Sequence, residues 1–517
     1  MPAGVYPEPR RRGRHDEHSP RLQALISTIP ERHIKFAFVK NEQPFQVIFL
    51  TLNYFVDMQL EGYWGAAAHE ICRGEAMLLG VEREVKAREE HIEGLFKRYP
   101  DVNAEVIVKE DAQREGFMFT SEAINFGGGE VLKTYHLFSW DQGRLDKMDD
   151  QKAPIKLPNV IEVHGGPYEL RRTIMRPRIN PSSPYLIDVV DGVPRILDRA
   201  TRKLIADIKP WGKPPLDYFK KQFSDGTPFP HVLEERGDCI VFRQCQYWGP
   251  EDECKFCDIN ENARTKKLLG QVGYITPKKP EEVAEAAFHL FIVEDWTRFP
   301  DMRRPYQIHL NGGTIEHILR KQSEQEFYLS FVAAVRERTG NKVPIMLQSI
   351  PWPEEMEKRA KETGVTSRSS NFEVWDEDLF EVISPGKARH IGRNEWIRRM
   401  LDQVDIFGVG HVIPGFVAGV EMAQPWGFKT VKEAVRSTTE GLKFFMSHGI
   451  VVRPISWCVE ALSALGGQTP PPVDYFIQID RNWYDLLLEF DLPPQTRHPI
   501  GPGRNHYPNS AAWDMGD

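Results

Sequence analysis

The sequence predicts an α/β protein built around a parallel strand and helix unit in residues 231–460. Segments with the composition of buried strands alternate there with segments whose apolar residues recur at helical spacing. Such alternation along a chain favours a parallel sheet or barrel. A chain of 517 residues is too long for one compact core, and its hydrophobic content of 41% is enough to bury several. We therefore expect two or three domains.

Four further segments flank this unit. Residues 1–30 carry several arginines with little apolar periodicity and are expected to form a disordered basic tail. Residues 31–150 are expected to form an N-terminal α+β domain. Residues 151–230 are rich in proline and predict a hairpin linker or insert. Residues 461–517 contain a triple proline, an aromatic helical pattern and an irregular end, so a C-terminal helix and tail are expected.

Local patterns before residue 231 predict several elements. Apolar residues at helical spacing predict a helix over 65–99, and the apolar segments 104–108 and 133–139 predict strands. The Asp191–Gly192 pair lies between two apolar runs and predicts a hairpin turn. The residues 199–202 should then lead into a third strand.

The central region is predicted to hold six strands and five helices. The strands are expected at 238–244, 306–310, 343–350, 369–374, 408–413 and 451–455. The helices are expected at 281–294, 324–338, 353–363, 394–403 and 431–448. Functional side chains in such folds lie at the carboxyl ends of the strands.

The composition argues against several classes of partner. A net charge of −8 disfavours a nucleic-acid partner held by its phosphates. No uninterrupted apolar run reaches membrane-spanning length, and the first residues lack the apolar core of a signal peptide. Six cysteines in so long a chain fit a reducing compartment better than a disulfide framework. We expect a cytoplasmic protein that acts on a small molecule without a membrane partner.

Three cysteines lie close together after the first predicted strand of the central region. Cys245, Cys254 and Cys257 stand in the stretch CQYWGPEDECKFC, with gaps of eight and two residues. A C-x-x-C turn points both sulfurs at one centre, and the longer gap can arch back to add the third. Three thiolates leave one iron of a [4Fe–4S] cluster open for a ligand. The alternative is a zinc knuckle completed by a histidine such as His231.

The cysteine stretch resembles the loop of the radical SAM enzymes, whose three cysteines are most often spaced C-x3-C-x2-C. The closing C-x-aromatic-C is intact at residues 254–257, whereas the first gap is longer. The resemblance implies a partial (βα)6 TIM-like barrel over 231–460. It also implies a [4Fe–4S] cluster on Cys245, Cys254 and Cys257, with S-adenosylmethionine on the open iron. Phe256 would pack near the adenine.

Other stretches are similar to the family's motifs for binding this cofactor. Asn311-Gly312-Gly313-Thr314 corresponds in place to the motif that binds the methionine amino group, and Ser369, Asn371 and Glu373 to the set that binds the ribose. Ile413 and Gly415 belong to a stretched form of the element that flanks the adenine. A cation that pairs with the methionine carboxylate could be any of four residues, namely Lys387, Arg389, His390 and Arg393.

The resemblance implies that one electron cleaves the cofactor to a 5′-deoxyadenosyl radical, which abstracts a hydrogen atom from a small-molecule substrate. Such an oxygen-sensitive enzyme needs a one-electron donor such as flavodoxin or ferredoxin. Polar residues expected to point into the barrel toward the substrate are His309, Gln348, Glu373 and His411. Two other readings remain open, a zinc-stabilised binding protein without activity and a radical SAM enzyme that modifies RNA.

Overall fold

The computed structural model describes residues 87–126, 158, 160–180, 182–211, 216–268, 275–299, 304–460, 462–493 and 510–516. The predicted basic tail, the first part of the helix over 65–99, the strand over 133–139 and most of the C-terminal tail lie outside the described residues.

Three helices lie around the first strand of the first sheet, two before it and a short one after it. α3 (Arg88–Arg98) confirms the end of the predicted long helix, and α5 (Ser121–Asn125) is capped by the Thr120 side chain. The strand predicted over 104–108 is wrong, because these residues begin the helix α4 (Ala104–Glu115). Its β-branched run Val106-Ile107-Val108 has the composition of a strand, but burial of nearly every side chain of α4 lets tertiary packing override that preference.

A six-stranded sheet follows in the order β1-β4-β5-β6-β2-β3. Its strands are β1 (Met118–Phe119), β2 (Ile161–Gly165), β3 (Leu170–Met175), β4 (Tyr185–Val190), β5 (Val193–Asp198) and β6 (Leu204–Ile208). The predicted hairpin is confirmed, since β4 and β5 pair antiparallel up to Val190 and Val193. Both turn residues have positive φ, 54° at Asp191 and 77° at Gly192, as a two-residue hairpin turn requires. The third predicted strand is β6, which pairs with β5.

Parallel strands in chain order occupy the central region. One sheet contains β7 (Asp238–Phe242), β8 (Ile308–Gly312), β9 (Ile345–Gln348) and β10 (Ser367–Ser369), and a second contains β11 (Gly415–Ala418) and β12 (Arg453–Ser456). Parallel bridges from Arg368 to Val412 and from Glu373 to Phe416 link the two sheets. In the part of the chain that the structure describes, β7 and β12 are edge strands, so the combined sheet is open.

Two of the predicted strands lie elsewhere than the sequence indicated. The segment 369–374 contributes only its first residue to β10, because Glu373 has a φ of 77° and leaves the extended conformation. The segment 408–413 forms a turn after a helix, with Gly408 and Gly410 at φ of 97° and 77°, and β11 begins only at Gly415. The mixed α/β architecture itself is as predicted.

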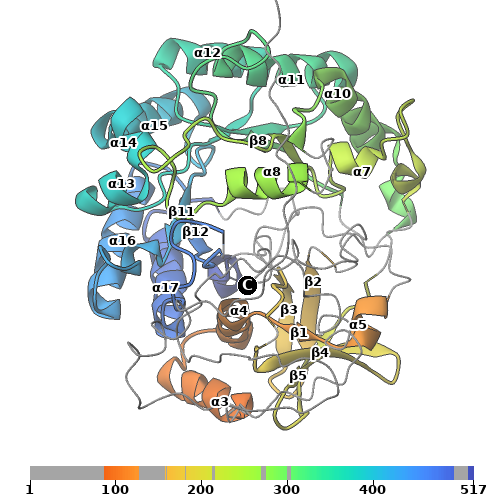
Figure 1. Ribbon diagram of the computed structural model, residues 1–517, viewed down its shortest axis with the longest axis vertical. Coiled ribbons are helices and arrows are strands. Elements are labelled where there is room, and N and C mark those ends of the chain that lie inside the picture. Colours follow the sequence, from red (N-terminus) through yellow and green to blue (C-terminus); the bar gives the residue numbers. More distant parts are fainter. Residues whose placement is uncertain are drawn as a thin grey trace, which may run out of the picture. The chain divides into compact units, whose positions relative to one another are not determined.

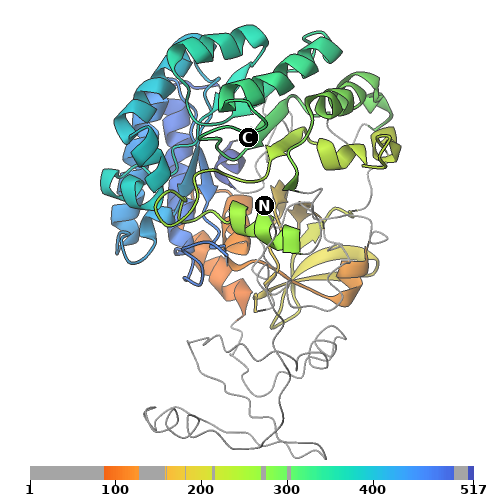
Figure 2. The same ribbon diagram turned by 45° about the horizontal axis from the view of Figure 1, so that its top comes forward.

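The five predicted helices are present with ends shifted by a few residues. They are α10 (Pro280–Phe288), which continues as a π-helical turn over His289–Val293, α11 (Glu324–Thr339), α12 (Glu354–Thr363), α15 (Arg393–Phe407) and α16 (Val431–Ser447). Figures 1 and 2 show the helices α10 to α16 following one another around the outside of the parallel strands. The predicted C-terminal helix is α17 (Val473–Glu489), which packs with α16 in one apolar core and also contacts β12.

Four further helices in the described part of this region were not predicted. They are α7 (Phe229–Val232), α8 (Ile259–Leu268), α13 (Glu377–Ile383) and α14 (Pro385–His390). Among the helices of the described residues, none has both the length and the apolar character that crossing a membrane requires.

Candidate functional site

A cavity of about 350 Å³ lies at the carboxyl ends of the parallel strands. The segments that follow β7, β8, β9, β10 and β12 all contribute to its wall, and β11 contributes Val417. The sequence-predicted site residues that line it are Cys245, Cys254, Phe256, Cys257, Gly312, Gly313, Thr314, Gln348, Asn371 and Glu373.

The three cysteines of the predicted cluster loop all line this cavity. Cys245 is held from α8, because its N–H donates to the Asn260 side-chain oxygen at 2.8 Å and its carbonyl accepts from the Asn260 amide nitrogen at 2.8 Å. The C-x-x-C turn is closed by the Cys257 N–H, which donates to the Cys254 carbonyl at 2.9 Å. The chain thus fixes both ends of the loop.

Burial dominates the electrostatics of these thiols. It raises the pKa of Cys254 to about 12, against the opposing charge of Lys387, and it raises the pKa of Cys245 and Cys257 above the ordinary thiol value. Thiols in such a setting stay protonated at neutral pH unless a bound metal displaces the proton. Three thiols on the wall of one cavity are the donor set that an iron–sulfur cluster requires.

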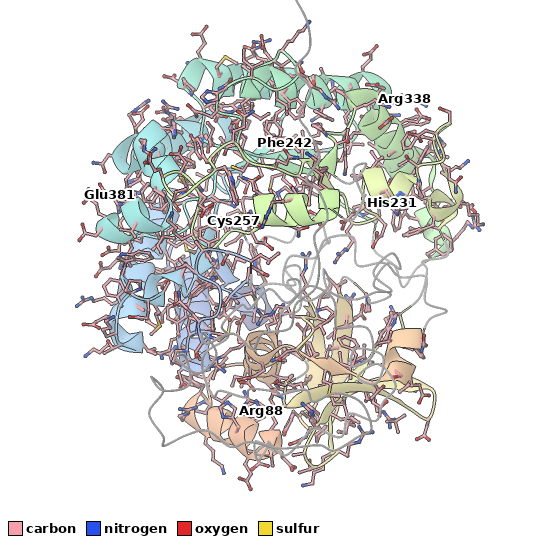
Figure 3. All side chains as sticks on the ribbon, viewed as in Figure 1. Arg88, His231, Phe242, Cys257, Arg338 and Glu381 are labelled. Atoms are coloured by element: carbon pink, nitrogen blue, oxygen red, sulfur yellow. The ribbon has the colours of Figure 1, made fainter. Side chains whose placement is uncertain are left out.

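The zinc knuckle completed by His231 is not favoured. His231 lies on α7 and does not line the cavity, and Figure 3 shows it well apart from Cys257, which lies near the start of α8. In the described residues, no three His, Cys, Asp or Glu side chains form a group that could hold a single metal ion. Cysteines that each bind a different iron of one cluster do not need to meet at a single point.

The glycine pair at the end of β8 makes room for the cysteine loop. A Cβ at Gly313 would lie 1.8 Å from the Gln244 carbonyl oxygen and 2.7 Å from the Cys245 Cα, and one at Gly312 would lie 2.8 Å from the Phe242 carbonyl oxygen. The sequence predicted that these glycines admit a ligand, and the structure shows that they admit the backbone of the cysteine loop. Thr314 completes this contact, since its carbonyl accepts from the Gln246 N–H at 2.8 Å.

The polar residues after β10 divide between the cavity and the interior of the sheet. Asn371 lines the cavity, and its side-chain oxygen accepts from the Gly415 N–H at 2.8 Å. Ser369 is fully buried away from the cavity lining, where its hydroxyl accepts from Arg453 at 2.7 Å and donates to Asn371 at 3.2 Å. Ser369 therefore orients Asn371.

An ion pair between Glu373 and Lys387 lies in the cavity wall. The Lys387 ammonium donates to the Glu373 carboxylate at 2.6 Å and to the Asn371 carbonyl at 2.7 Å, and it lies 4.8 Å from the centre of the Trp396 ring. Glu373 adopts a left-handed φ of 77°. Strained residues of this kind concentrate at functional sites.

Lys387 is the one of the four cations considered from the sequence that lines the cavity. The Arg393 guanidinium donates instead to the Trp375 carbonyl at 2.7 Å and lies 4.5 Å from the centre of the Trp375 ring. Arg389 and His390 pair with acidic residues of the cysteine loop.

Neither residue predicted to flank the adenine lines the cavity. Ile413 is buried, and its N–H donates to the Arg368 carbonyl at 2.8 Å. Gly415 begins β11, where a Cβ would lie 2.9 Å from the Ile455 side chain. Gly415 therefore lies behind Asn371 and Ile455, which do line the cavity.

Of the four substrate candidates, Gln348 and Glu373 line the cavity, whereas His309 and His411 do not. His309 is buried between Asp238, 3.1 Å from its Nδ1, and Gln348, 3.0 Å from its Nε2. His411 is exposed, and its carbonyl accepts from the Arg368 N–H at 2.8 Å. His309 is thus linked to the cavity lining through its contact with Gln348.

Several cavity residues were not found from the sequence. Trp457 and Glu460 line the wall directly after β12 and obey the same strand-end rule that located the others. Trp248 and Trp396 also line the cavity, but they come from a loop and from α15, where no local pattern marks their direction.

Comparisons with known proteins give distant structural neighbours only. No family model and no curated protein matches the chain. Methylornithine synthase is 14% identical with a TM-score of 0.34, over 57% of this chain and 84% of that one. Coproporphyrinogen III oxidase from Escherichia coli, described as a radical SAM enzyme, is 12% identical with a TM-score of 0.28, over 36% and 40%.

A third neighbour is the FeFe-hydrogenase maturase from Carboxydothermus hydrogenoformans, 12% identical with a TM-score of 0.31, over 53% of this chain and 59% of that one. Of these three neighbours, coproporphyrinogen III oxidase is the one described as a radical SAM enzyme, the family that the cysteine loop resembles. At TM-scores this low the likeness by itself carries no argument about the reaction, which has to be drawn from the site.

Proposed function

We propose that this chain is a radical SAM enzyme that binds a [4Fe–4S] cluster through Cys245, Cys254 and Cys257. The observation that carries the proposal is that these three cysteines line one cavity at the carboxyl ends of six parallel strands in chain order. That is where cofactors bind in α/β folds. The six strands would act as a partial (βα)6 TIM-like barrel.

When bound, the cluster and S-adenosylmethionine supply the chemistry, a reductive cleavage whose 5′-deoxyadenosyl radical takes a hydrogen atom from the substrate. The chain's own residues bind S-adenosylmethionine and orient it. Lys387 offers an ammonium for the methionine carboxylate, Glu373 a carboxylate for its amino group, and Asn371 an amide for the ribose. Phe256 offers an aromatic face for the adenine.

The rest of the cavity suits a small substrate. Trp248, Trp396 and Trp457 give it largely apolar walls, which exclude water from a reactive radical. A net charge of −8 disfavours the alternative of an RNA substrate. We propose that a small one-electron donor protein of the flavodoxin or ferredoxin class supplies the electron in the cytoplasm.

The proposal is tested by cluster assembly. The protein is reconstituted anaerobically with iron and sulfide, and both are quantified per chain. We expect about four irons and four sulfides, as the cluster contains, and a loss of most of both in Cys254→Ala and Cys257→Ala.

The matched control is Cys239→Ala. Cys239 is a buried thiol in β7 that donates to the Val232 carbonyl at 3.3 Å and does not line the cavity, so its removal should leave the iron content unchanged. A wild-type protein that retains zinc and takes up no iron would contradict the proposal.

A further inference from the structure

The eight residues between Cys245 and Cys254 are held from outside by the short helix α14. The Gly386 N–H donates to the Asp252 carbonyl at 3.1 Å. The Arg389 guanidinium donates to the Glu251 carbonyl at 2.6 Å and pairs with the Asp252 carboxylate at 2.9 Å. The loop's acidic stretch is therefore tied to α14 by both backbone and side chain.

His390 adds three further contacts at the end of the same helix. Its Nε2 lies 3.2 Å from the Asp252 carboxylate and its Nδ1 lies 3.1 Å from the Glu316 carboxylate, on the segment after β8. Its ring stacks on the buried ring of Tyr247, with centroids 4.8 Å apart and an interplanar angle of 11°. One side chain thus joins both halves of the loop to the strand end behind them.

The helix that holds the loop also reaches the cavity. Lys387 lies between Gly386 and Arg389 in the sequence, and its ammonium binds Glu373 and the Asn371 carbonyl in the cavity wall. The six residues of α14 therefore contact the cysteine loop on one side and the proposed cofactor site on the other.

We propose that α14 is a clamp that sets the spacing of Cys245 and Cys254, with Gly386, Arg389 and His390 as positioning residues. The inference rests on the proposed function. If the eight residues between Cys245 and Cys254 were mobile, cluster binding would have to order them and would lose conformational entropy. A loop that α14 already orders avoids this loss.

The most direct test is to add a single methyl group where α14 contacts the cysteine loop. In Gly386→Ala the new Cβ would lie 2.5 Å from the Asp252 carbonyl oxygen and 3.0 Å from the Tyr247 ring, so the loop has to move. The control is Gly94→Ala in α3, where the new Cβ would meet nothing within 4 Å. Both changes put the same methyl group on a helix.

The first readout needs no cluster. Hydrogen exchange of the amides of residues 245–257 is measured on the metal-free full chain. We expect exchange to be about tenfold faster in Gly386→Ala, as the loss of one or two hydrogen bonds implies, and unchanged in Gly94→Ala. Equal exchange in wild type and Gly386→Ala would overturn the clamp.

The second readout is the reconstituted protein's reduced-cluster EPR spectrum and midpoint potential. We expect Arg389→Ala/His390→Ala to shift both, and His390→Gln with Arg389 intact to keep them near wild type. Unchanged values in the double variant would also overturn the clamp. If the wild type takes up no iron, the proposed function fails, and the exchange experiment alone decides whether α14 orders the loop.

Discussion

At the scale of single residues, the site combines a strained backbone at Glu373 with a buried ion pair. Glu373 keeps a left-handed backbone and a buried carboxylate, and the Lys387 ammonium 2.6 Å away compensates its charge. Both side chains are about one-tenth exposed, so the pair is shielded from water without being sealed from the cavity. A buried pair is costly to break, because the remaining charge loses its partner.

Lys387→Met should lower the free energy of unfolding by about 3 kcal/mol, because it leaves the Glu373 carboxylate buried without its cation. Urea denaturation of the metal-free protein measures this change. The control Lys358→Met removes an exposed helical pair with Glu354 and should cost less than about 1 kcal/mol. Equal effects of the two changes would show that the Glu373–Lys387 ion pair adds no more to the free energy of unfolding than an exposed pair does.

The sequence located the cluster cysteines because their chemistry lies in one contiguous stretch with a recognisable turn. It could not choose the cation among Lys387, Arg389, His390 and Arg393. That choice depends on which way each side chain leaves α14 and the start of α15, and α14 was not predicted. Tertiary packing decides which way each side chain points from a short helix, and no local sequence pattern reveals it.

At the scale of elements, a buried ion pair fastens β10 to two helices. The Arg368 guanidinium in β10 binds the Glu357 carboxylate of α12 through two nitrogens, at 2.7 and 2.9 Å. The Gln403 amide of α15 donates to the same carboxylate at 2.7 Å. Both charged side chains are fully buried, and the strand that they fix ends next to Asn371.

Arg368→Met should destabilise the protein by about 3 to 5 kcal/mol, since it leaves the Glu357 carboxylate buried without its counter-charge. The double change Arg368→Met/Glu357→Leu should cost less than the sum of the two single changes. Urea unfolding of the four proteins completes the cycle. Arg398→Met on the exposed face of α15 is the control, and a loss as large there would contradict the account.

Most of the longer elements could be predicted, whereas β10 and β11 were misplaced and α4 was assigned the wrong type, for reasons that differ. The helices α11, α12 and α16 have clear periodicity and, at their ends, caps or a terminal glycine. β10 and β11 were misplaced because their bounds depend on contacts between two distant segments, such as the hydrogen bonds from Phe372 and Glu373, after β10, to the Gly415 carbonyl at the start of β11. α4 was mistaken for a strand because its helical state depends on burial from several sides.

At the scale of the whole molecule, Glu110 joins the first sheet's helix α4 to the cavity wall. Its carboxylate accepts from the Ser456 hydroxyl at 2.8 and 2.9 Å and from the Ala511 N–H at 3.0 Å. Ser456 ends β12 and lines the cavity. Burial raises the pKa of Glu110 to about 7, against the opposing effects of Ser456, Lys109 and the Ala511 N–H, and Asp480 also hydrogen-bonds with it.

Stability should therefore depend on Glu110 between pH 4.5 and 7. In the unfolded chain this acid ionises near its ordinary value of 4.5, whereas the folded protein holds the proton up to about 7. The folded state binds more protons in that window, so this group lowers the free energy of unfolding as pH rises through it.

Glu110→Gln should flatten the profile of stability against pH between 4.5 and 7. Thermal or urea unfolding at half-unit pH steps measures it, with the exposed Glu440→Gln as control. A wild-type slope that persists in Glu110→Gln would contradict the assignment and point to another buried acid, such as Asp480 of α17.

The central claim concerns the reaction, and one anaerobic measurement tests it most directly. The reconstituted protein is reduced with dithionite and given S-adenosylmethionine, and 5′-deoxyadenosine is quantified by mass spectrometry. The account predicts its formation in the wild type and in Cys239→Ala, and its loss in Cys254→Ala and Cys257→Ala. A wild-type protein with a full complement of iron and sulfide that binds S-adenosylmethionine and yet forms no 5′-deoxyadenosine would contradict it.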